Sequence, residues 1–125
     1  SPLRLISITF YRTSSFKHHL AAVEADVLDE VFHSLLAEHP HFDIIKHSIY
    51  NFERSLSHGN RRAEELKEVS KMLEDLRLAN HMSKATAIWQ NNLGTLEKTN
   101  SMSEIKENFV SFAKQLSADL RDIKE

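Results

Sequence analysis

The chain has 125 residues, a formal net charge of −2 and no cysteine, which excludes disulfide frameworks, thiolate metal sites and cysteine nucleophiles. It contains only two glycines and two prolines, which argues against a loop-rich or all-β fold because such folds need many turns. The small negative charge gives no general attraction for nucleic acid, and no apolar run approaches the roughly 18 residues of a membrane-spanning helix. These features predict one all-α domain, long enough to bury a core.

Residues 1–15 form an apolar arm whose secondary structure the sequence leaves open. Leu3, Ile6 and Phe10 have helical spacing, while alternate apolar residues in the same stretch suit a short strand. The arm is also basic, contains serine and lacks acidic residues, a composition typical of organelle-import segments and membrane-surface helices. We expect the arm to pack on the rest of a cytoplasmic protein, with organelle import of a longer precursor as the alternative.

The first two predicted helices lie on either side of a proline. One runs from about Phe16 to Glu38, and Pro40 ends it because the residue before a proline is pushed out of helical geometry. The second begins after Asp43, whose side chain can cap the first turn. It stops at Gly59, because a glycine can take the left-handed conformation that follows many helices.

A long run and a final helix follow. Residues 60–99 would make a helix of about 60 Å at 1.5 Å per residue, which is too long for a small domain. Near residues 80–83 polar residues take over the apolar positions, so either the apolar stripe drifts around one kinked helix or the helix breaks and Ser83 caps a new one. Ser101 and Glu104 have the spacing of a capping box, and one apolar stripe then continues to Ile123.

Four or five amphipathic helices joined by short turns predict an antiparallel bundle. Residues 1–15 are then a short N-terminal arm, and residues 16–125 are a single bundle domain.

Signatures of catalysis are missing from the sequence. There is no glycine-rich phosphate loop, no nucleophile elbow and no His-Glu-x-x-His motif, and the carboxylates stand beside lysine and arginine as on solvated faces. The basic pair Arg61–Arg62 has Glu64 and Glu65 close by, which makes it a poor track for a nucleic-acid backbone. We therefore expect no enzyme activity, no cofactor and no nucleic-acid partner.

Eight histidines are the most unusual feature of the composition. His39, His41 and His47 could meet around one turn, but ordinary surface histidines explain them as well, and we predict no metal site. Glu30 and His33 form one Glu-x-x-His pair, whereas a ferritin-like di-iron bundle needs two.

His81 is the histidine with the clearest alternative role. It is followed by Lys84 within residues 80–87, Asn-His-Met-Ser-Lys-Ala-Thr-Ala, on the polar face of the long run. This stretch resembles the phosphoacceptor helix of histidine-phosphotransfer signalling modules, which are four-helix bundles of about this length. The resemblance implies His81 as a mid-helix phosphoacceptor and Lys84 as the cation that screens the added charge. It departs from that family at Ser83, usually apolar there, and at Ala85, usually glycine.

A ligand pocket inside the bundle is a second alternative. Trp89, with Met82 and Leu93, could line a sensor pocket for a fatty-acyl chain or haem, although single tryptophans at helical spacing more often belong to the core. For haem, His33 and His47 are the histidines best placed to point inward.

The leading interpretation is a non-catalytic helical interaction or regulatory module that works through protein contacts. These contacts are either self-association into a homo-oligomer or docking on a partner protein. The expected contact surface comprises the arm and the wide face of the first predicted helix, because apolar surface beyond what one bundle can bury marks an interface. Its residues are Leu3, Ile6, Ile8, Phe10, Tyr11, Leu28, Phe32 and Leu36.

Overall fold

The chain is all-helical in the part that its structure describes. A computed structural model describes residues 2–41 and 43–123, and for residues 2–11 it describes the backbone alone. The helices in these ranges are α1 (Pro2–Glu24), α2 (Leu28–Glu38), α3 (Ile44–Asp75), α4 (His81–Thr95), α5 (Met102–Glu107) and α6 (Phe109–Arg121). The predicted all-α class is confirmed, whereas the predicted count of four to five helices is wrong. None of the described helices is both long enough and apolar enough to cross a membrane.

The first predicted helix is divided in two. α1 ends at Glu24 and α2 begins at Leu28, and between them Asp26 has a φ of 59°, in the left-handed region that ends a helix. The prediction of one helix from residue 16 to residue 38 is therefore wrong. The backbone of residues 2–15 is helical and continues through residue 15 without a break, which settles the choice between strand and helix there.

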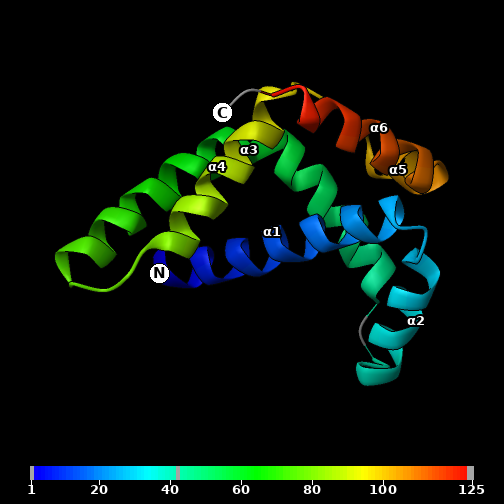
Figure 1. The fold of residues 1–125 in the computed structure, drawn as a ribbon, viewed down its shortest axis with the longest axis horizontal. Coiled ribbons are helices and arrows are strands. Elements are labelled where there is room, and N and C mark those ends of the chain that lie inside the picture. The colour runs from blue at the N-terminus through cyan, green and yellow to red at the C-terminus, as the bar shows by residue number, and fades with distance from the viewer. Residues whose placement is uncertain (1, 42, 124–125) are drawn as a thin grey trace.

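The second predicted helix and the first half of the long run are one continuous helix, α3. Asp43 caps it as expected, its Oδ1 accepting a hydrogen bond of 3.0 Å from the backbone N of Lys46. The predicted stop at Gly59 is wrong, and Figure 1 shows that α3 bends near its middle instead. The long run is divided, as one of the two alternatives has it, but before the expected place: α3 ends at Asp75, Arg77 takes a φ of 59°, and α4 starts at His81 with Asn80 in the cap position instead of Ser83.

The two glycines of the chain lie where α3 and α4 pack together. A Cβ atom on Gly59 would overlap the carbonyl oxygen of Gln90 and would lie 2.8 Å from the backbone N of Gly94. A Cβ atom on Gly94 would lie 2.6 Å from the backbone N of Asn60. Gly59 in the middle of α3 therefore allows the backbones of α3 and α4 to touch. It does not take the left-handed conformation that was expected for it.

The final helix starts as predicted and is then interrupted. The Ser101 Oγ accepts from the backbone N of Glu104 at 3.2 Å, and the Glu104 Oε1 accepts from the backbone N of Ser101 at 3.3 Å, so the capping box is confirmed. At Asn108 the backbone leaves helical geometry, with φ −129° and ψ 47°, and the chain turns from α5 into α6. The prediction of one unbroken helix to Ile123 is wrong for this reason.

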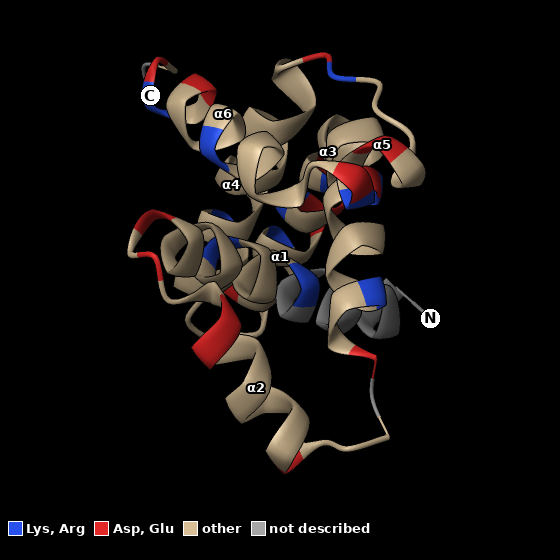
Figure 2. Cartoon of the chain, turned by 90° about the vertical axis from the view of Figure 1, so that its right-hand side faces the viewer, with Lys and Arg blue, Asp and Glu red and all other residues tan. Residues whose placement is uncertain are grey.

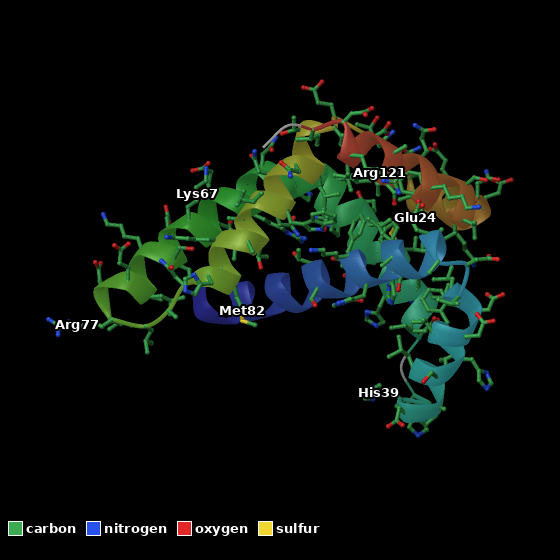
Figure 3. The ribbon with its side chains drawn as sticks, viewed as in Figure 1. Glu24, His39, Lys67, Arg77, Met82 and Arg121 are labelled. Carbon is green, nitrogen blue, oxygen red and sulfur yellow. The ribbon has the colours of Figure 1, made fainter. Side chains whose placement is uncertain are left out.

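An aromatic cluster joins α1, α3 and α6. The rings of Phe16 and Phe52 are stacked with centroids 3.8 Å apart, and the centroid of Phe109 lies 5.1 Å from that of Phe52. At the surface, an ion pair of 3.1 Å between Glu24 and Arg121 joins the ends of α1 and α6, and Figure 3 shows the two residues close together. α2 extends away from this core, at the opposite end of the molecule from the turn that joins α3 to α4 (Figure 1).

Candidate functional site: the α3–α4 hairpin

Exposed apolar side chains gather at the end of the α3–α4 hairpin. Leu76 and Leu78 lie in the turn, and Met82 and Ile88 lie on α4. Leu76 is 62% exposed and Met82 is 69% exposed, and the other two are more than half exposed. Single exposed apolar residues are ordinary on a protein surface, but four within residues 76–88 make a patch of the kind found at contact sites.

A lysine-lined groove runs beside this patch, between α3 and α4. It has a volume of about 690 Å³, and its charged lining consists of Lys67, Lys71 and Lys84 with one carboxylate, Glu74. Ile88 contributes apolar surface to the same groove. The groove therefore combines positive charge with an apolar wall, which suits an acidic amphipathic segment.

A second groove lies between α1 and α4, and Ile88 forms the ridge that the two grooves share. Its volume is about 510 Å³, and Met82 and Trp89 are among its lining residues. The ammonium group of Lys17 lies 5.6 Å from the centre of the Trp89 ring, which places a cation over the aromatic face. Two residues of the patch thus line these grooves: Ile88 lines both, and Met82 lines the second.

A buried amide fixes the helices beneath these grooves. Gln90 is fully buried, and its Nε2 donates to the Oγ1 of Thr13 at 2.6 Å and to the Oγ of Ser55 at 3.3 Å. One α4 side chain thereby connects α1, α3 and α4 through its Nε2, whereas its Oε1 is buried without a hydrogen-bond partner among the described residues.

Comparison with known proteins gives a family for these helices. Residues 22–93 match the model of a family described as a domain of unknown function, DUF1932, and this stretch is more than half of the chain. The chain belongs to this family. The match contains α2, α3 and nearly all of α4, so both grooved helices are part of the DUF1932 domain. No curated protein and no solved structure matches the chain.

The fold buries some residues of the predicted apolar contact surface and leaves another exposed. Phe32 is 8% exposed and packs against the rings of His19, at 5.1 Å between centroids, and Phe109, at 6.3 Å. Leu28 packs against the core, whereas Leu36 is exposed. The expectation of a free apolar face that includes Phe32 and Leu28 is therefore corrected. The side chains of Leu3, Ile6, Ile8, Phe10 and Tyr11 lie outside the described residues.

The three residues predicted to line one ligand pocket do not all lie at the same place. Met82 and Trp89 line the same surface groove, and Figure 3 shows Met82 on the side of α4 that faces α1. Leu93 is fully buried in the main core and does not line that groove. Among the histidines considered for haem, His33 and His47 are exposed and so do not point into the bundle.

His81 does not have the position that the phosphotransfer resemblance assumes. It is the first residue of α4 instead of a mid-helix residue, because the chain turns between Asp75 and His81. Both His81 and Lys84 are exposed, so the imidazole and the ammonium remain accessible on one helix. Across the described chain, no group of three or more histidine, aspartate or glutamate side chains is arranged to hold a metal ion.

The buried histidine, His19, has no motif or spacing that would single it out from the sequence. The Ser48 hydroxyl donates its one proton to the carbonyl oxygen of Ile44 at 2.7 Å, so it accepts the 3.0 Å hydrogen bond from the Nδ1–H of His19. Burial, with a smaller contribution from neighbouring His18, lowers the pKa of His19 to about 4. His19 therefore acts as a neutral structural donor between α1 and α3.

Proposed function

We propose that this DUF1932 domain is a non-catalytic helical module that works by self-association. In the proposed contact, α2 of one copy lies in the lysine-lined groove between α3 and α4 of another. The observation that carries the proposal is the exposed apolar patch of Leu76, Leu78, Met82 and Ile88 beside that groove. Covering this patch would supply about 25 cal/mol for each Å² of apolar surface removed from water.

α2 has the chemistry that the groove requires of its occupant. It begins with Asp29 and Glu30, ends with Glu38 and contains no lysine or arginine, and Figure 2 shows red residues at both ends and no blue along it. Leu36 is exposed on the same helix and offers an apolar side chain to the groove. Opposite charges aligned in this way orient two surfaces and speed their encounter.

The positions of the two surfaces favour contact between two copies. α2 and the turn of the hairpin lie at opposite ends of one molecule (Figure 1), so they can meet only across two chains. A two-fold arrangement would form this contact twice, and both ends would be satisfied in a closed dimer. A stable dimer of this kind should bury at least about 1,200 Å² in total.

Charge reversal in the groove tests the proposal. We expect sedimentation velocity to show a dimer for the unmodified chain and a monomer for the double variant Lys71→Glu, Lys84→Glu. Lys114→Glu is the matched control, because it reverses an exposed lysine on α6, away from the groove. Adding Glu30→Lys to the double variant should restore part of the dimer. If the unmodified chain stayed monomeric at a concentration of about 100 µM, this contact would be ruled out.

A further inference from the structure

A cluster of arginines surrounds one tyrosine where α1 crosses α3. The guanidinium carbon of Arg12, on α1, lies 5.2 Å from the centre of the Tyr50 ring. That of Arg54, one turn along α3 from Tyr50, lies 6.0 Å from the same centre. Arg62 follows Arg54 by two turns on α3, its Nη1 is buried without a hydrogen-bond acceptor, and the charges of Arg12 and Arg54 lower its pKa, so we include it in the cluster. We call Arg12, Tyr50, Arg54 and Arg62 the arginine cluster.

The positive charge of the arginine cluster is poorly balanced by the chain. Glu53 approaches Arg54 with an O–N distance of 3.8 Å, and among the described residues it is the one carboxylate that pairs with a guanidinium group of the cluster. Neighbouring segments have no acid to offer, because residues 1–23 and 77–96 contain no aspartate or glutamate. Glu64, which is close to Arg62 in sequence, instead pairs with Lys67 at 3.0 Å.

The electrostatic effect of this imbalance is visible at two groups. The pKa of Arg62 is lowered, first by burial and then by the charges of Arg12 and Arg54. The pKa of His58, on the same helix, is lowered by partial burial and then by the surrounding arginines. In both cases burial is the first cause, and the charges of neighbouring arginines add to it in the same direction.

Two donors of the arginine cluster are buried without a partner. Among the described residues, neither the Nε of Arg54 nor the Nη1 of Arg62 has a hydrogen-bond acceptor, although both atoms are shielded from solvent. Buried charged donors are almost always paired, since leaving one unpaired costs more than a neutral group does. The side chains themselves remain partly exposed, so an acceptor from outside the chain can reach the guanidinium groups.

We propose that the arginine cluster is a binding site for a phosphate group, held by the guanidinium groups of Arg12, Arg54 and Arg62 beside the Tyr50 ring. A phosphate dianion supplies the missing negative charge and several acceptor oxygens at once. Guanidinium groups match it well, because their planar fork donates two parallel hydrogen bonds to two of its oxygens. The site is separate from the α3–α4 groove lysines and does not depend on self-association.

Inorganic phosphate is the probe for the test. We expect the ³¹P resonance of phosphate to broaden and saturate on addition of the protein, with a Kd in the millimolar range or tighter. The melting temperature should be higher in phosphate than in sodium chloride of equal ionic strength, because a ligand that binds the folded state alone stabilises it. Malonate, measured in the same way, separates phosphate from carboxylate chemistry.

Variants locate the binding. Arg12→Gln should weaken phosphate binding at least tenfold, and Arg62→Lys should weaken it too because the bidentate fork is lost. Arg77→Gln is the matched control, since Arg77 lies at the far end of α3 (Figure 3), and it should bind within twofold of the unmodified chain. Unchanged phosphate broadening in Arg12→Gln, equal melting temperatures in phosphate and chloride, or tighter binding of malonate than phosphate would each overturn the proposal.

Discussion

Replacing Gly59 with alanine measures how closely α3 and α4 approach each other. The added Cβ would overlap the carbonyl oxygen of Gln90 and crowd the backbone N of Gly94, and neither atom can move without its helix. In an ordinary helix interior, alanine would be favoured over glycine by about 1 kcal/mol. Overpacking against backbone costs about 3 kcal/mol, at the upper end of its usual range. We therefore expect a net loss of about 2 kcal/mol in the free energy of unfolding.

Urea unfolding followed by far-UV circular dichroism is the assay. Ser57→Ala is the matched control, because Ser57 is exposed two residues earlier on the same helix, and its change should stay within about 0.5 kcal/mol. Gly94→Ala should lose stability for the same reason as Gly59→Ala. The double variant should lose less than the sum, since one separation of the helices relieves both overlaps. If Gly59→Ala were as stable as the unmodified chain, the close approach of α3 and α4 would be refuted.

Three further predictions concern a buried histidine, a helix cap and the hairpin patch. Well above pH 6.5, His19 is neutral in both the folded and the unfolded chain. As the pH is lowered from 6.5 toward 4, the unfolded chain binds a proton at this histidine before the folded chain does. The free energy of unfolding therefore decreases as the pH is lowered, by about 2 kcal/mol at pH 5. His19→Asn should remove that part of the loss between pH 7.5 and pH 5 in urea unfolding, whereas His18→Asn should keep it. Ser101→Ala should cost about 1 kcal/mol, and the lowered pKa of Glu104, which depends first on its hydrogen bonds with Ser101, should rise in a ¹³C NMR titration; an unchanged pKa would contradict the capping box. Ile88→Ser should weaken self-association in sedimentation velocity, and at a concentration where both chains are monomeric it should leave the melting temperature unchanged, because Ile88 is half-exposed in the monomer; equal dimer fractions would argue against the patch as the contact.

Local sequence signals predict two of the helix starts, those of α3 and α5. Asp43 and Ser101 were assigned as caps from their own neighbourhoods, and in both cases the donor that the cap satisfies lies three residues away. The same kind of signal failed at Gly59, because its role is set by Gln90, which is 31 residues further along the chain. A glycine that ends a helix and a glycine that admits a second helix look alike in one sequence.

The candidate sites depended on contacts that no local pattern contains. Phe32 belongs by its spacing to the wide apolar face that was expected to be a contact surface. In the fold, Phe109, which is 77 residues further along the chain, packs against Phe32, so Phe32 is part of the core. Arg62 is near acidic residues in sequence, yet in the fold it is grouped with Arg12 from α1. Helical spacing predicts which side chains share a face, and only the packing of the helices decides what covers that face.

The buried amide of Gln90 sets the alignment of three helices along their axes. If α4 slid by one helical turn, about 5.4 Å, the amide Nε2 would lose its hydrogen bonds to both Thr13 and Ser55. An apolar residue at this position would tolerate several such offsets. Gln90 therefore discriminates between helix registers that hydrophobic packing alone would leave close in energy, and it holds the two grooves of α4 at a fixed position relative to α1 and α3.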